Sequence, residues 1–103
     1  MSKVRVFYPN TPDSTFDLDY YVNTHIPMVQ GKLGAACTGV AVESGLGGGA
    51  PDAPATYNAM GYLYFDSVDS LQGSFRPHAE AMMENVQNFT NIEPVIQLSE
   101  VKV

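Results

Sequence analysis

The sequence predicts an α+β fold with a four-stranded antiparallel sheet and two helices on one face of it. Two observations carry this prediction. The hydrophobic periodicity runs strand, helix, strand, strand, helix, strand, which is the order of a split βαβ arrangement. Hydrophobic residues make up 45% of the 103 residues and charged residues 16%, a balance typical of one globular domain, which we place over residues 1–103.

The first third of the chain is expected to form a strand and a helix. Residues 3–8 alternate between two faces, and Pro9 ends this strand. Asp17 or Thr15 is suited to cap the helix that follows, and Gly34 is suited to end it. The apolar stripe of this helix is formed by Leu18, Tyr21, Val22, His25, Ile26, Val29 and Leu33.

The rest of the chain is expected to add three strands and a helix. Residues 38–45 and 57–65 read as two strands joined by a Gly/Ala/Pro-rich loop, and Gly61 marks either a bulge or a close backbone approach. Asp66 or Ser67 can cap the second helix. Pro77 is expected to interrupt that helix, and the last strand is expected within residues 93–101.

Both faces of the predicted sheet need to be covered. Alternate residues of a strand point to opposite faces of the sheet, and here both alternating sets, or phases, are apolar or aromatic. One phase holds Met60, Tyr62 and Tyr64, and the other holds Tyr57, Leu63 and Phe65. The two helices cover only one face. We therefore expect a second copy of the chain on the other face, which gives a homodimer.

Charge and cysteine content exclude several classes of partner. The net charge is −6 with only five Lys and Arg, so a nucleic-acid or anionic-membrane partner is not expected. The single cysteine, Cys37, cannot form an internal disulfide and is interpreted as a small buried residue. The first residues read as a strand and not as a secretory leader, so we predict a cytoplasmic protein.

The stretch Tyr-Tyr-Val-Asn-Thr-His-Ile-Pro, residues 20–27, holds the strongest candidates for chemistry. Tyr21 and His25 are four residues apart and share the helix face that packs toward the sheet. Pro27 removes a backbone N–H, so a kink or a second helix starting near it is expected. His25 is the candidate general acid or base, Tyr21 a candidate catalytic hydroxyl, and Tyr20 and Asn23 candidate substrate contacts. The alternative is that His25 is a hydrogen-bonded core residue.

Other polar residues give weaker signals. His78 is expected at a helix start after Pro77, and the adjacent Arg76 could bind a substrate carboxylate or pair with an acid of this chain. Tyr62 and Tyr64 are further candidate substrate contacts. The two histidines lie 53 positions apart without a metal-ligand spacing, so no metal site is predicted. Gly45, Gly47 and Ala50 fit a dinucleotide spacing but no helix follows them, so that motif is rejected.

The chain resembles the EthD family, named for ethyl tert-butyl ether degradation. The matching pieces are "VRVFYP", "FDLDYYVNTHIPMV", "YNAMGYLYFDSVDSLQGSF" and "VQNFTNIEPVIQLSEV", which together span nearly the whole sequence. The resemblance implies a ferredoxin-like fold assembled as a dimeric α/β barrel. It also implies that His25 is a pocket histidine with Tyr21 nearby, in an accessory protein of xenobiotic catabolism.

Three functional hypotheses follow. The first is an enzyme that needs no cofactor and uses His25 as general acid or base on a small apolar or aromatic metabolite, with Tyr21 or Tyr62 stabilising an oxyanion. The second is a non-catalytic accessory or metabolite-binding protein of an oxidative degradation pathway. The third, drawn from relatives of the architecture, is haem contact through His25 or His78.

Overall fold

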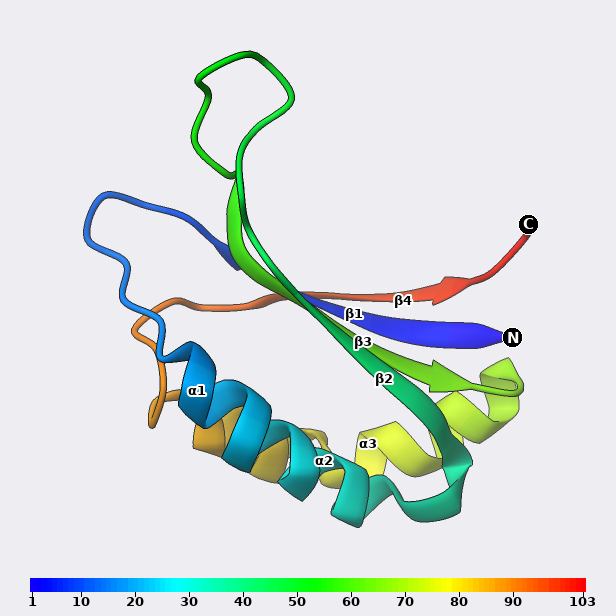
Figure 1. Ribbon diagram of the computed structural model, residues 1–103. Coiled ribbons are helices and arrows are strands. Elements are labelled where there is room, and N and C mark those ends of the chain that lie inside the picture. The colour runs from blue at the N-terminus through cyan, green and yellow to red at the C-terminus, as the bar shows by residue number, and fades with distance from the viewer.

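The computed structural model describes all residues 1–103 and confirms the predicted order of elements (Figure 1). The four strands form one antiparallel sheet in the order β2-β3-β1-β4, and all helices lie on the same face of it. The elements are β1 (Ser2–Pro9), α1 (Leu18–Tyr20), the π-helical turn η1 (Tyr21–His25), α2 (Ile26–Leu33), the 3₁₀ turn η2 (Gly34–Ala36), β2 (Cys37–Ser44), β3 (Tyr57–Phe65), α3 (Val68–Val86) and β4 (Val95–Glu100).

The central strands bury one face against the helices, as the alternation predicts. Val4 and Tyr8 of β1 are 0% and 1% exposed, and Leu63 and Phe65 of β3 are also buried. Val29 and Leu33 of α2 pack on these strands together with Leu71 and Met82 of α3. Burying each of these large side chains contributes roughly 1.5–3 kcal/mol to stability.

The helix of residues 18–33 changes its hydrogen-bonding pattern just before Pro27. Asp17 caps the start, because its carboxylate accepts a hydrogen bond from the N–H of Tyr20. The N–H of Ile26 then bonds the carbonyl of Tyr21, five residues back, which is the π pattern, and Pro27 lies in the first turn of α2. The proline therefore starts a new helical segment, which confirms the expected second helix start.

Two expectations for the second helix have different outcomes. Ser67 caps it, as predicted, by accepting a hydrogen bond from the N–H of Ser70. The predicted interruption at Pro77 is wrong: α3 runs unbroken over 19 residues with the proline inside it. Pro77 is exposed, so its ring lies on the solvent side of the helix. His78 consequently lies in the middle of α3, and the expectation that it sits at a helix start is wrong as well.

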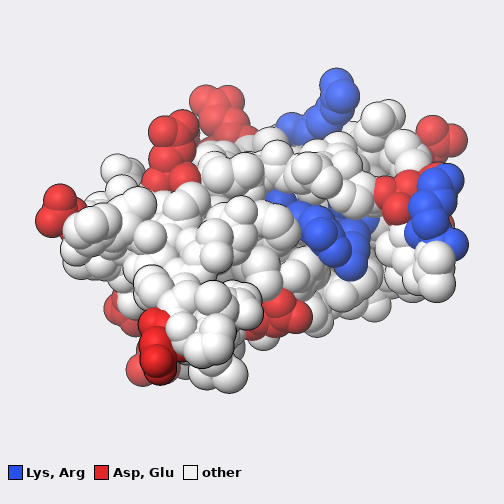
Figure 2. All heavy atoms as spheres, turned by 90° about the horizontal axis from the view of Figure 1, so that it is seen from above, with Lys and Arg blue, Asp and Glu red and all other residues white.

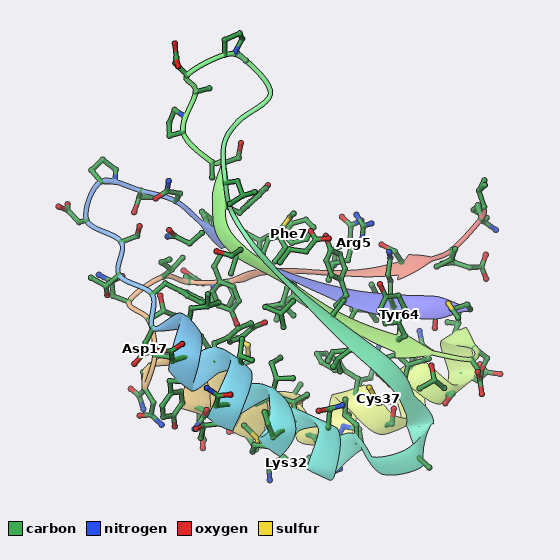
Figure 3. All side chains as sticks on the ribbon, in the orientation of Figure 1. Arg5, Phe7, Asp17, Lys32, Cys37 and Tyr64 are labelled. Atoms are coloured by element: carbon green, nitrogen blue, oxygen red, sulfur yellow. The ribbon has the colours of Figure 1, made fainter.

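The second face of the sheet carries no helix. Arg5, Phe7 and Tyr64 project from it on the side away from the helices (Figure 3). The assignment of Tyr57 to the phase of Leu63 is wrong, because the register shifts between Tyr8 and Pro9 and brings the Tyr57 ring to 5.0 Å from that of Phe7. Figure 2 looks onto this side, where basic side chains lie within a largely uncharged surface.

No helix in this structure is both long enough and apolar enough to cross a lipid bilayer.

Candidate functional site

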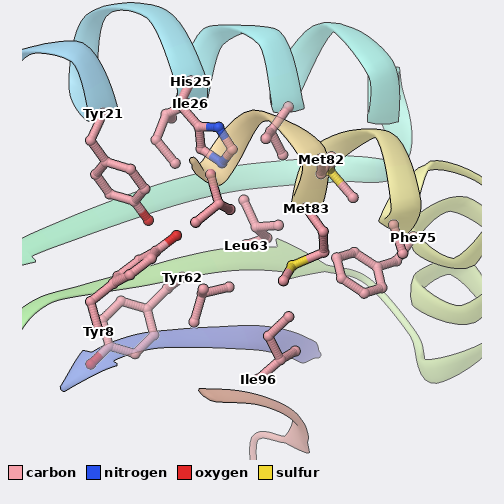
Figure 4. A pocket seen from close by; sticks show the side chains of 15 residues that line it. Tyr8, Tyr21, His25, Ile26, Tyr62, Leu63, Phe75, Met82, Met83 and Ile96 are labelled. Carbon is pink, nitrogen blue, oxygen red and sulfur yellow. The ribbon is translucent and has the colours of Figure 1, made fainter. Parts of the chain in front are cut away.

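A small cavity lies between the helix layer and the sheet (Figure 4). Its volume is about 40 Å³, and 13 of its 15 lining residues are hydrophobic. The lining includes no Asp, Glu, Lys or Arg. A group that enters this cavity therefore meets an apolar surface in which a few uncharged polar atoms decide orientation.

His25 supplies the titratable group of the cavity. The ring projects from η1 toward the sheet and is 5% exposed, which confirms the expected inward orientation. It stacks on Tyr21 at 5.5 Å between centroids, with 16° between the ring planes, and contacts Phe89 at 4.7 Å. Aromatic packing on two sides fixes the plane of the imidazole, so that its free edge has a defined direction.

Asn85 of α3 fixes the proton position on this ring. Nδ1 of His25 lies 2.8 Å from Oδ1 of Asn85, and the amide nitrogen of Asn85 donates to the hydroxyl of Tyr20. An amide oxygen accepts only, so Nδ1 carries the hydrogen. Nε2 is then the unprotonated nitrogen. Figure 4 shows one ring nitrogen on the cavity side, and with Nδ1 engaged by Asn85 we assign that nitrogen as Nε2.

The surroundings of His25 favour the neutral ring. Burial lowers the pKa of His25, and the hydrogen bond to Asn85 opposes this effect only in part. A neutral imidazole with a free Nε2 is the form that accepts a proton. The site thus contains a base in its working state near neutral pH.

Two tyrosine hydroxyls lie beside the imidazole. Tyr21 reaches down from η1 and Tyr8 reaches up from β1, so that their hydroxyls point toward each other (Figure 4). Both side chains are 1% exposed, and burial raises the pKa of both groups, that of Tyr21 to about 12. Both are therefore neutral O–H groups at physiological pH.

Gly61 makes room for the hydroxyl of Tyr21. A Cβ atom at position 61 would lie 2.1 Å from this oxygen, which no real contact permits. The register of β3 is continuous through this residue, so of the two expectations the close approach is confirmed and the bulge is wrong. Only glycine allows the Tyr21 hydroxyl to lie against the sheet here.

The remaining wall of the cavity is deformable. Phe75, Met82 and Met83 of α3 lie along it, and Met83 is 39% exposed. A cavity of about 40 Å³ is smaller than the roughly 150 Å³ that holds a benzene ring. Methionine side chains are unbranched and change rotamer easily, so these two residues are the part of the wall that can yield to a ligand.

Several candidate substrate contacts lie away from the cavity. Asn23 is exposed, and Tyr20 accepts hydrogen bonds from Asn85 and Asn88 without lining the cavity. Tyr62 runs along the cavity, but its hydroxyl donates to Glu43 on the helix-free face of the sheet. Tyr64 projects from that same face.

His78 and Arg76 also lie apart from the site. Both belong to α3, neither lines the cavity, and Arg76 is exposed. Of the predicted candidates, the structure brings Tyr21 and His25 together at the cavity. Tyr62 also lines the cavity, but its hydroxyl points away to Glu43. No three His, Cys, Asp or Glu residues are placed to hold a metal ion.

Two residues of the site were not identified from the sequence. Asn85 follows Met82 by three residues and precedes Phe89 by four, so helical spacing would have placed it on the inner face. Tyr8 is buried on the helix-covered face of β1, and its partner Tyr21 is 13 positions away in the sequence. No local pattern reports that their hydroxyls meet.

Comparisons with known proteins identify relatives of this chain. The EthD domain family matches residues 9–93. An EthD-like protein from Ralstonia eutropha JMP134 shares 40% identity, with 99% of this chain and 92% of that chain covered and a TM-score of 0.90. An ethyl tert-butyl ether degradation family protein from Bacillus halodurans C-125 shares 20% identity, with 99% of both chains covered and a TM-score of 0.68.

A more distant structure has the same fold. A dimeric protein with a ferredoxin-like fold from Bacteroides fragilis NCTC 9343 shares 14% identity, with 97% of this chain and 95% of that chain covered and a TM-score of 0.56. This likeness supports the ferredoxin-like α+β fold alone. A search of the curated proteins finds no match.

Proposed function

Starting from the fact that this chain belongs to the EthD domain family, we propose that it acts without a cofactor on a small apolar or aromatic metabolite, with His25 as general acid and base. One observation carries the proposal: a buried, neutral imidazole whose Nδ1 is held by Asn85 and whose Nε2 faces an uncharged cavity. The alternative of a hydrogen-bonded core residue accounts for the contact with Asn85 but gives no role to Nε2 at the cavity wall.

The chemistry open to this site is proton transfer. Nε2 takes a proton from an acidic C–H or O–H of the bound molecule; that bond breaks, its electron pair stays on the substrate, and an N–H bond forms. The reverse step returns the proton at the same or a neighbouring atom. The neutral hydroxyl of Tyr21 donates a hydrogen bond to the oxygen on which negative charge develops.

A generic proton-exchange assay tests this proposal without knowledge of the natural substrate. Cyclopentanone has acidic α C–H bonds, and deuterium uptake from D₂O at those positions is measured by NMR. We expect the protein to accelerate uptake above an equal concentration of free imidazole, and His25→Gln to remove the acceleration. The matched control His78→Gln should keep it. Equal rates with the wild type and His25→Gln would contradict a base function for His25.

A non-catalytic role is the second candidate, and the size of the cavity favours it. At about 40 Å³ the cavity accommodates a substrate only after its methionine wall moves. Saturable binding of cyclopentanone without proton exchange would support a metabolite-binding or accessory protein. For either candidate we propose a role in the degradation of ethers or other xenobiotics, in line with the ethyl tert-butyl ether family name of the relative from Bacillus halodurans, and a cytoplasmic location.

We also infer that a second copy of this chain covers the helix-free face of the sheet. This face carries Phe7, Tyr57 and Tyr64 together with Arg5, whose buried Nε atom has no hydrogen-bond partner. A contact between two such faces would remove the aromatic side chains from water. Dimeric relatives with this fold support the inference.

A further inference from the structure

The Tyr8 and Tyr21 hydroxyls form a buried pair without any other protein partner. Their rings lie 5.4 Å apart in a T-shaped arrangement, and each hydroxyl shifts the pKa of the other. They come from opposite walls, one from β1 and one from η1 (Figure 4). Gly61, beneath the Tyr21 hydroxyl, leaves the space that brings the two oxygens together.

The Tyr8–Tyr21 pair leaves one of its two hydroxyl hydrogens without a partner inside the pair. Two hydroxyls bring two O–H donors, and only one of these can point at the oxygen of the other tyrosine. No hydrogen bond within the chain engages the second donor, so it is free to donate to an oxygen atom that enters the cavity.

The same cavity excludes charged head groups. No basic side chain lines it to neutralise an anion, and the raised pKa values of both tyrosines show that their surroundings disfavour negative charge. A carboxylate or phosphate would lose its hydration without a counter-charge. An uncharged acceptor loses far less.

We propose that the Tyr8–Tyr21 hydroxyl pair binds the oxygen of an uncharged carbonyl compound with an apolar body. The carbonyl oxygen accepts the second O–H, and Phe75, Met82 and Met83 contact the apolar part. Nε2 of His25, which has no protein partner either, then faces the hydrogens next to the carbonyl group. The assignment rests on the proposed function for its reaction, while the binding step stands independently.

Three ligands of similar shape test the assignment by calorimetric or NMR titration. Cyclopentanone presents a carbonyl oxygen, methylenecyclopentane replaces that oxygen with CH₂, and cyclopentanecarboxylate adds a charge. We expect the double variant Tyr8→Phe/Tyr21→Phe, which removes both donors, to weaken cyclopentanone binding about tenfold, the value of one hydrogen bond to a buried donor. Each single variant keeps one O–H that can donate to the ketone and should lose less. Methylenecyclopentane should bind these variants within about twofold of wild type, and cyclopentanecarboxylate should not bind.

Controls separate this assignment from the proposed function. Tyr64→Phe removes a hydroxyl on the opposite face of the sheet and should change no affinity. His25→Gln should keep the preference for the ketone even though proton exchange is lost. Unchanged binding of methylenecyclopentane shows that a tyrosine variant is folded. Equal loss of both neutral ligands, loss of neither, no ketone binding to wild type, or tight carboxylate binding would each overturn the assignment.

Discussion

Nδ1 of His25 lies 2.8 Å from Oδ1 of Asn85, and this contact joins two helices 60 residues apart in sequence directly above the cavity. It does two things at once. It satisfies the buried imidazole of His25 and the half-buried amide of Asn85, and it leaves the proton-accepting nitrogen of the imidazole free. Asn85 itself is oriented by the hydroxyl of Tyr20, which accepts from its amide nitrogen.

Changing Asn85 to Asp should raise the pKa of His25. A carboxylate at position 85 would favour the imidazolium form that burial now disfavours. NMR titration of the His25 ring protons measures this directly. Asn88→Asp is the matched control, because Asn88 also bonds Tyr20 but does not contact the imidazole, and it should leave the titration nearly unchanged. A pKa that stays the same or falls in Asn85→Asp would contradict the contact.

Stability should depend on pH through His25. Burial lowers the pKa of His25 in the folded state below its ordinary value of 6.5, so between these two values the unfolded chain binds a proton that the folded chain does not. The free energy of unfolding therefore falls as the pH drops below 6.5 and levels off below the folded-state pKa; above 6.5 the contribution is fully present.

Urea unfolding at pH 7.5 and 5.5 measures that difference. His25→Gln should lose less stability over this interval than the wild type, whereas His78→Gln should behave like the wild type. If all three proteins lose the same amount, His25 is not the group responsible.

Gly61→Ala should destabilise the fold by about 1–3 kcal/mol, the usual cost of overpacking. The added methyl group would meet the Tyr21 hydroxyl at 2.1 Å. Tyr21→Phe removes that oxygen, so the double variant should regain much of the loss, a coupling that a double-mutant cycle in denaturant detects. Gly73→Ala in α3 is the control: no atom lies within 4 Å of its added Cβ, and it should stabilise by about 0.5–1 kcal/mol. Additive effects at positions 61 and 21 would show that the two do not touch.

Phe7→Glu should disrupt self-association. The ring lies in the middle of the helix-free face, beside Tyr57 and Tyr62, and a carboxylate there would be buried between two copies. Sedimentation analysis should show a dimer for the wild type and a monomer for this variant. Gln72→Glu, an exposed change on α3, should remain dimeric. A wild-type monomer at micromolar concentration would contradict the inferred interface.

The order of elements was predictable because each one carries its own local signal. The bounds of β3 match residues 57–65, and the caps at Asp17 and Ser67 follow from side-chain chemistry within three residues. Pro77 does not break the helix because tertiary packing of the flanking turns outweighs the cost of a proline in a helix interior. Phe75 and Met82 provide such packing on either side of it.

The site was predictable only where its members share one helix. Tyr21 and His25 lie four residues apart, so helical spacing placed them together. Asn85 and Tyr8 approach them from α3 and β1, and those contacts depend on how the layers pack. The shift between Tyr8 and Pro9 likewise has no local signal, which is why Tyr57 was assigned to the wrong face.

The proton position on His25 tests most directly whether this residue is a base that faces the cavity. Long-range ¹H–¹⁵N correlation spectra of the imidazole rings at pH 7, assigned with His78→Gln, distinguish a protonated from an unprotonated ring nitrogen. We predict a neutral His25 with hydrogen on Nδ1 and none on Nε2. A hydrogen on Nε2, whether in the other tautomer or in an imidazolium, would contradict it.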